Sequence, residues 1–128
     1  METTLPQITA VHMQDEEIIQ ATARQVIKDF QMYDLQLSFE RKGETPYQVL
    51  FDQILPRIRQ MMQNDVGTLH ALLYTIDIPD HWWAHVRHEP DLNTVASAIT
   101  DLILRRELLK VLTRMAFSQK KLENSDET

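Results

Sequence analysis

The residues best suited to chemistry lie in one short stretch, HWWAHVRH, at residues 81–88. Its three histidines, His81, His85 and His88, follow one another at i, i+4 and i+7. On an α-helix, which turns by about 100° per residue, these three imidazoles share one face. Imidazoles at i and i+4 are typical ligands of Zn²⁺, Ni²⁺ or Cu²⁺. The spacing therefore indicates a candidate metal site.

Two other interpretations of these histidines stay open. The favoured one is an exposed polar face that binds Zn²⁺ or Ni²⁺ only adventitiously, because no carboxylate is placed by spacing to orient the imidazoles. His88 also lies next to Pro90, where a helix must end. The other is a pH-sensitive surface, since neighbouring imidazolium groups repel one another below about pH 6.5. Neither HExxH nor Glu-x-x-His occurs in the sequence, so the metalloprotease and di-iron signatures are absent.

Trp82 and Trp83 lie between the histidines and project about 100° apart on a helix. We expect the tryptophans to pin the short helix to the core, with one indole only partly covered. Because tryptophan is enriched at binding hot spots, a partner groove beside Trp82 or Trp83 is the alternative.

Arg106, Lys110 and Arg114 form a basic stripe at i, i+4 and i+8. Cations near a helix C-terminus complement the helix dipole, and this is the structural explanation that the sequence favours. The functional alternative is a docking face for an acidic ligand. Asp77 and Asp80 resemble a capping box at the start of the helix that follows, rather than an acid–base pair.

Several common chemistries have no counterpart in the sequence. There is no cysteine, so thiolate nucleophiles, thiolate metal sites and disulfides are excluded. With glycine only at positions 43 and 67, no phosphate-binding loop or dinucleotide fingerprint can be built. We therefore predict no catalytic residue and no resident cofactor, and the chain leans toward a non-enzymatic role.

The apolar residues repeat with the helical period over most of the chain, which predicts an all-α fold of about five helices. We expect a helix from about Asp15 to Gln31, a second with Thr45 as N-cap and Pro46 as first residue, and a third over Val66–Ile76 capped by Asp65. A short fourth helix holds residues 81–88. A long fifth helix runs from Leu92 to Phe117 with Asp91 as its cap.

The segment 33–39 alternates apolar and polar residues as a strand does. Since the chain offers no obvious strand for it to pair with, we expect an extended connector laid on the helices. The alternative is an edge strand that pairs with its copy in a dimer.

The apolar face of the fifth helix changes side along its length. Within about 60° of Arg106 lie Leu92, Val95, Ile99, Leu102 and Ile103. On the opposite side, between about 140° and 240°, lie Leu104, Leu108, Val111, Leu112 and Met115. A continuous helix with this pattern must pack against two different bodies, and otherwise it breaks near Arg105–Arg106. The second body is a crossing helix or a second subunit, so the candidate interaction residues of this helix are Arg106, Leu108, Lys110, Val111, Arg114 and Met115.

Composition completes the prediction. The formal net charge of −6 argues against general nucleic-acid binding, and neither a signal peptide nor a membrane-spanning run is visible, which predicts a cytoplasmic protein. We expect a flexible N-terminus over 1–12, one bundle domain over 13–117 and a flexible polar tail over 118–128.

LLYTIDIPD and the helix after it resemble small helical proteins common in bacteria. The leading hypothesis is a protein-interaction or scaffold role through homodimerisation. The alternatives are a metal-binding protein or metalloenzyme that uses the histidine cluster, and the docking of an acidic ligand on the basic stripe.

Overall fold

The structure is a computed structural model of the 128-residue chain. It describes residues 15–40 and 45–126, with side chains to residue 121. These residues form helices and no strand: α2 (Glu16–Gln31), α3 (Pro46–Asn64), α4 (Val66–Ile76), the 3₁₀ helix η1 (Asp80–His85) and α5 (Leu92–Asp126). The predicted all-α fold with a long last helix is confirmed.

The α-helices begin where the sequence predicts, because a polar side chain accepts hydrogen bonds from backbone N–H groups in the first turn of each. Thr45 Oγ1 accepts from the N–H of Gln48 at 3.3 Å, and Pro46 follows as the first helical residue. The other three α-helices have aspartate caps, Asp15, Asp65 and Asp91, whose carboxylates accept from N–H groups of the first turn at 2.9 to 3.2 Å.

The predicted capping box at Asp77 and Asp80 is wrong. Asp77 ends α4 instead: it adopts the left-handed conformation, with φ 64°, and its N–H donates to the carbonyl of Leu73 at 3.0 Å. Pro79 takes the N-cap position of η1, where no side chain caps the helix. An aspartate tolerates the left-handed C-cap better than most side chains, and this explains why Asp77 serves the preceding helix.

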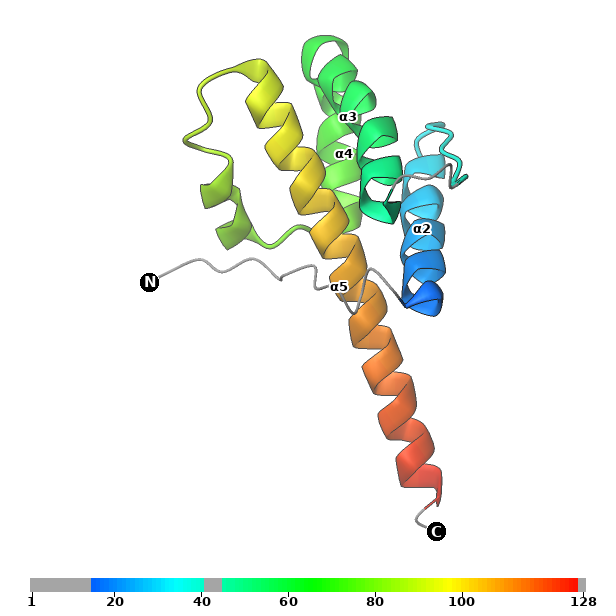
Figure 1. Cartoon of the computed structure of the whole chain (residues 1–128). Coiled ribbons are helices and arrows are strands. Elements are labelled where there is room, and N and C mark those ends of the chain that lie inside the picture. Colours follow the sequence, from blue (N-terminus) through cyan, green and yellow to red (C-terminus); the bar gives the residue numbers. More distant parts are fainter. Residues whose placement is uncertain (1–14, 41–44, 127–128) are drawn as a thin grey trace.

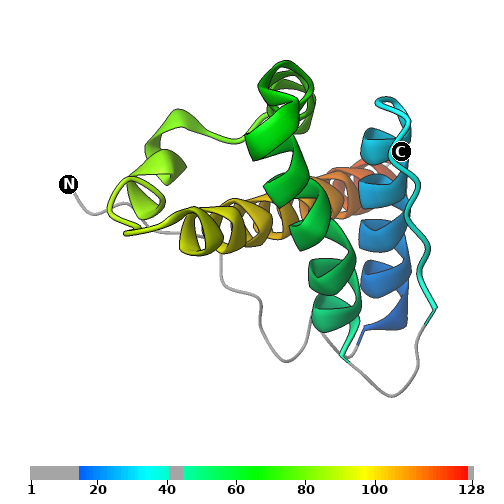
Figure 2. The ribbon, with the colours of Figure 1, turned by 90° about the horizontal axis from the view of Figure 1, so that it is seen from above.

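α5 is the central element of the bundle. α3 and α2 pack on it, and α4 contacts α2, α3 and α5 (Figure 1). η1 lies to the left of α5 and α2 to its right in Figure 1, and the view from above shows η1 beside the start of α5 and α2 across its second half (Figure 2). The middle of α5 is buried over most of its circumference, at Leu102, Ile103, Leu104, Glu107 and Leu108.

This arrangement explains the change of apolar face along α5. The helix is continuous, as the favoured interpretation requires, and the alternative, a break near Arg105–Arg106, does not occur. Ile99 and Ile103 of the first half and Leu104 and Val111 of the second half are all buried within a single chain. The second body predicted for α5 is therefore a neighbouring helix, and no second subunit is needed to cover these residues.

The end of α5 differs from the prediction. The helix continues to Asp126, so the boundary placed at residue 117 is wrong, and residues 118–126 are helical rather than a tail. Their described side chains, Ser118 to Lys121, are exposed. They carry no apolar stripe, which is why the sequence pattern did not reveal a helix there. The expected flexible N-terminus, residues 1–12, lies outside the described residues.

The segment after α2 is an extended connector, as predicted. Leu35, Leu37 and Phe39 are half-buried against the core. Side chains of α3 hold the polar positions between them: Gln53 bonds both backbone groups of Ser38, and Arg57 Nη2 donates to the carbonyl of Gln36 at 2.6 Å. Helix side chains thus take up backbone groups that strand pairing would use. Pairing with a second copy stays untested.

Candidate interaction site

The three histidines do not share a helical face. Their helix is of the 3₁₀ type and ends at His85, and His88 lies in the turn beyond it. Because a 3₁₀ helix has about three residues per turn, residues at i and i+4 are about 120° apart. The described part of the chain contains no group of three or more His, Cys, Asp or Glu that could hold a metal ion. Metal binding by these histidines remains a prediction.

The two tryptophans differ in burial, as expected. Trp82 is only 3% exposed and belongs to the core, where the His81 ring meets it edge-on at a centroid distance of 6.4 Å. Trp83 is half-buried against the same core. Trp82 therefore anchors η1 and is closed to a partner, and Trp83 keeps a solvent-facing part.

Arg106 joins α5 to the end of α4. Its Nε donates to the carbonyl of Asp77 at 2.8 Å, and its Nη2 lies 3.4 Å from the Asp77 carboxylate. That carbonyl belongs to a helix C-terminus, where positive charge is favoured. Arg106 thus complements the dipole of α4 and not that of its own helix, whose C-terminus lies about five turns further on.

Lys110 is held by two buried carboxylates. Its Nζ lies 3.1 Å from Oε1 of Glu107 on α5 and 3.3 Å from Oδ2 of Asp29 on α2. Glu107 is completely buried, and its Oε2 has no hydrogen-bond partner among the described residues. Burial and the neighbouring Asp29 together raise the pKa of Glu107 to about 8, against the lowering effect of Lys110. A proton on Glu107 allows its carboxyl group to donate a hydrogen bond to Asp29.

The basic stripe borders a hollow on the surface. Arg106, Lys110, Thr113 and Arg114 of α5 line it together with Gln25 of α2, around a volume of about 290 Å³. The structure thus brings Arg106, Lys110 and Arg114 to one site, as their spacing predicts. Two of the three are already engaged by aspartates or by Glu107.

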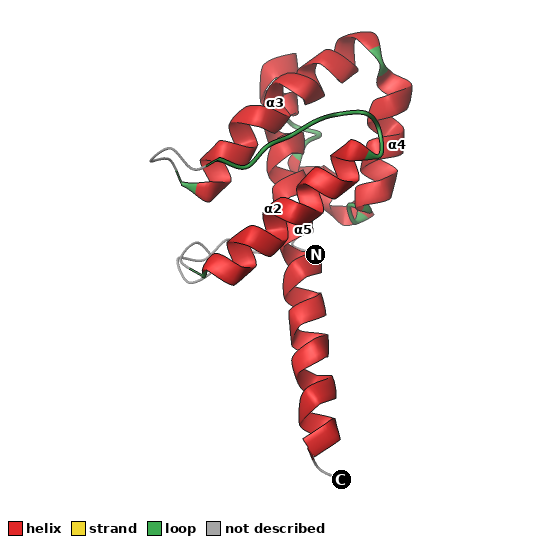
Figure 3. Cartoon of the chain, turned by 90° about the vertical axis from the view of Figure 1, so that its right-hand side faces the viewer, coloured by secondary structure: helices red, strands yellow, loops and turns green. Residues whose placement is uncertain are grey.

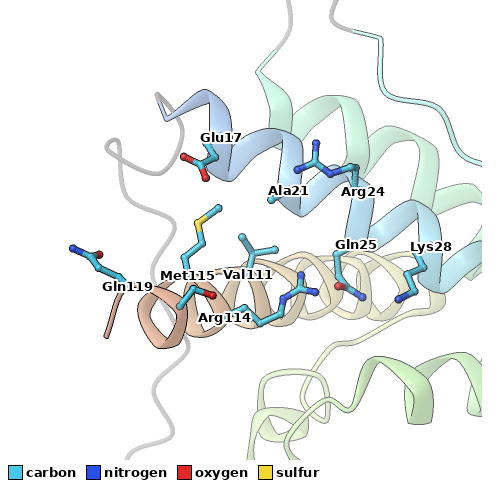
Figure 4. A pocket seen from close by; sticks show the side chains of 10 residues that line it. Glu17, Ala21, Arg24, Gln25, Lys28, Val111, Arg114, Met115 and Gln119 are labelled. Atoms are coloured by element: carbon cyan, nitrogen blue, oxygen red, sulfur yellow. The ribbon is translucent and has the colours of Figure 1, made fainter. Parts of the chain in front are cut away.

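A larger groove lies beside this hollow, between α2 and the second half of α5 (Figure 4). Its volume is about 690 Å³. We call it the α2–α5 groove and define it by its lining residues: Glu17, Ala21, Arg24, Gln25, Lys28, Val111, Arg114, Met115, Ser118 and Gln119.

Cations dominate the polar lining of the α2–α5 groove. Arg24, Lys28 and Arg114 face a single acidic residue, Glu17. Among the described residues, none of these three cations takes part in a salt bridge. The sequence analysis missed Arg24 and Lys28. Their spacing of one helical turn was visible, but their position opposite Arg114 depends on how α2 crosses α5.

The apolar candidates on α5 separate along the helix. Leu108 and Val111 are buried, so they hold the bundle together and offer little to a partner. Met115 is half-buried in the groove. One turn past Thr113, the aromatic side chain of Phe117 is 70% exposed. Phe117 was not predicted from the sequence, because it lies on the face of Arg106 and Lys110, opposite the apolar face predicted for the second half of the helix.

The comparisons with known proteins give no match: no family model fits the chain, and neither a curated protein nor a solved structure is similar to it. Of the helices in the described part of the chain, none is both long and apolar enough to cross a membrane.

Proposed function

We propose that this protein is a non-enzymatic interaction module, and that another protein docks where α5 leaves the bundle. We call residues 113–126 the α5 extension. The observation that carries the proposal is the exposure of Phe117 on this extension. The extension projects from the other helices (Figure 3), and its first residues line the α2–α5 groove. An exposed aromatic side chain next to a groove is a typical anchor of a protein interface.

The position of Phe117 supports this proposal. By helical spacing Phe117 follows Arg106, Lys110 and Thr113 at i+11, i+7 and i+4, and therefore continues the face that borders the smaller hollow. A partner that covers Phe117 would also reach the cations beside it. Interfaces combine such an apolar anchor with a polar rim.

Homodimerisation is the alternative, but the change of apolar face along α5 no longer supports it. It was expected because α5 buries opposite faces, and both faces are covered by helices of the same chain. A second copy is therefore an outcome that the experiment must distinguish from a different partner.

Position-specific cross-linking in the cell that makes the protein tests the proposal. Benzoylphenylalanine is incorporated at position 117, and for comparison at position 74, because Tyr74 is an aromatic residue of α4 that is 86% exposed. On irradiation we expect a discrete adduct at position 117 and none at position 74. Its mass, compared with twice 15.0 kDa, tells a second copy from a different protein.

Two results would contradict the proposal. One is the absence of any adduct at position 117, and the other is the same adduct at both positions, since this would mark adventitious contact. A mass of twice 15.0 kDa would replace the heterologous partner with a second copy.

A further inference from the structure

We infer that the α2–α5 groove binds an acidic amphipathic helix of the partner protein. This inference rests on the proposed function and names the chemistry of the partner. It depends on the composition of the groove, the spacing of its cations and the charge around them.

The groove has an apolar floor and a cationic wall. Ala21, Val111 and Met115 lie between the two helices, and the long polar side chains stand beside them (Figure 4). A partner that fills this groove has to present apolar and acidic side chains together. The apolar face of an amphipathic helix laid between two helices meets this requirement, and helix-in-groove recognition is common among protein interfaces.

The spacing of the cations matches a helix. Arg24 and Lys28 are one turn apart on α2, so their charged groups repeat at the interval at which carboxylates at i and i+4 repeat on a partner helix. Arg114 faces them from α5 across the groove. Carboxylates held between arginine and lysine side chains form charge-assisted hydrogen bonds, which are the stronger kind.

The surrounding charge favours an acidic partner. Glu17 is the only acid in the lining, and Asp29 and Glu107, which meet between α2 and α5, are buried and already engaged by Lys110. The groove is therefore locally cationic on a chain with net charge −6. That overall charge disfavours a nucleic acid, whose backbone requires a broad basic surface.

A binding titration with a defined probe tests the inference. The probe is a fluorescein-labelled helical peptide of about 20 residues, with leucine at i, i+3, i+4 and i+7 spacing and glutamate on the flanking positions. The matched control peptide carries glutamine in place of every glutamate. Fluorescence anisotropy is measured with the full chain at about 50 mM and about 300 mM salt.

The wild-type chain should bind the glutamate peptide roughly tenfold or more tightly than the glutamine peptide at low salt, and this preference should shrink at high salt. The double variant Arg24→Glu/Arg114→Glu should lose the preference. Arg59→Glu is the matched control, because it reverses an exposed arginine of α3 outside the groove, and it should keep the preference. Since Arg24 and Arg114 are exposed, the double variant should melt as the wild type does.

Equal affinity for the two peptides, or an equal loss in Arg59→Glu, would overturn the inference. Tighter binding of single-stranded DNA of about 20 nucleotides than of the glutamate peptide would overturn it as well, in favour of a nucleic acid. If the peptide fails but the adduct at position 117 forms, the interaction module stands and only the partner's chemistry is wrong. If both fail, the proposed function falls too.

Discussion

At the scale of single residues, the least expected feature is the fully buried Glu107. It shares Lys110 with Asp29, so two carboxylates and one cation lie in the interface between α2 and α5. Two ionised carboxylates beside one ammonium would leave an uncompensated buried charge, which is strongly unfavourable. The interface is therefore most stable when Glu107 holds a proton.

Stability should consequently fall as the pH rises. The pKa of Glu107 is about 8 in the folded protein, whereas an unperturbed glutamate has a pKa of about 4.3. Between these values the folded state holds a proton that the unfolded chain has released. The proton's contribution is complete below about pH 4 and is lost as the pH rises toward and through about 8.

Glu107→Gln should remove this dependence, because the amide cannot ionise and still donates toward Asp29. We expect the melting temperature of the variant to match that of the wild type near pH 4 and to exceed it increasingly as the pH rises, by about 5 °C or more at pH 9. Thermal melts across this pH range, with Glu17→Gln as the exposed control, measure the difference. Parallel pH profiles for Glu107→Gln and the wild type would contradict the assignment.

Trp82 gives a second prediction at this scale. Because its indole is 3% exposed and joins η1 to the core, Trp82→Ala should lower the free energy of unfolding by about 3–5 kcal/mol. Trp83→Ala, which truncates the half-buried neighbour, should cost about 1 kcal/mol. Chemical denaturation of both variants measures the two losses, and equal losses would refute this division of roles.

At the scale of elements, sequence patterns predicted where the α-helices begin. They did not predict the helix type of η1 or the residue at which α5 ends. Thr45–Pro46 and Asp65 determine where α3 and α4 begin through local hydrogen bonds, which are visible in the sequence. The sequence did not show that η1 is a 3₁₀ helix, because a single short turn of α-helix and one of 3₁₀ helix have similar residue preferences. The end of α5 was missed because its polar residues carry no core pattern.

The 3₁₀ geometry of η1 leads to a prediction about metal. Since His81 and His85 are not aligned as on an α-helix, we expect untagged protein to bind Zn²⁺ or Ni²⁺ with a Kd of roughly tens of micromolar or weaker. Replacing His85 with Ala should leave this binding nearly unchanged. Isothermal titration calorimetry decides: one submicromolar site that disappears in His85→Ala would establish a metal centre.

The α5 extension leads to a prediction about stability. A chain that ends after Phe117 loses only residues whose described side chains, Ser118 to Lys121, are exposed. Its melting temperature should therefore stay within about 2 °C of that of the full chain. A much larger fall, measured by circular dichroism, would show that the end of α5 contributes to the bundle.

At the scale of the whole molecule, the all-α architecture was predictable, but the groove was only partly so. The basic stripe of α5 could be read from its i+4 spacing, and it does line a hollow. Arg24 and Lys28 lie near this stripe because α2 packs across the second half of α5, which the sequence does not show. The crossing of two helices depends on tertiary packing, and helical periodicity in one segment contains no information about it.

The distribution of charge over the whole molecule explains why an acidic protein has a cationic groove. The net charge of −6 is an average over the chain, whereas docking depends on the local field within about 10 Å. Burial of Asp29 and Glu107 beneath Lys110 keeps two acids out of the groove lining. The net charge of the groove lining is therefore positive, because Arg24, Lys28 and Arg114 outnumber Glu17.

The most direct test is the cross-link at position 117, formed in the cell and compared between two charge-reversal backgrounds. If the native partner uses the α2–α5 groove, the adduct should disappear in Arg24→Glu/Arg114→Glu and persist in Arg59→Glu. An adduct that persists in both backgrounds, or disappears in both, would contradict docking at this groove.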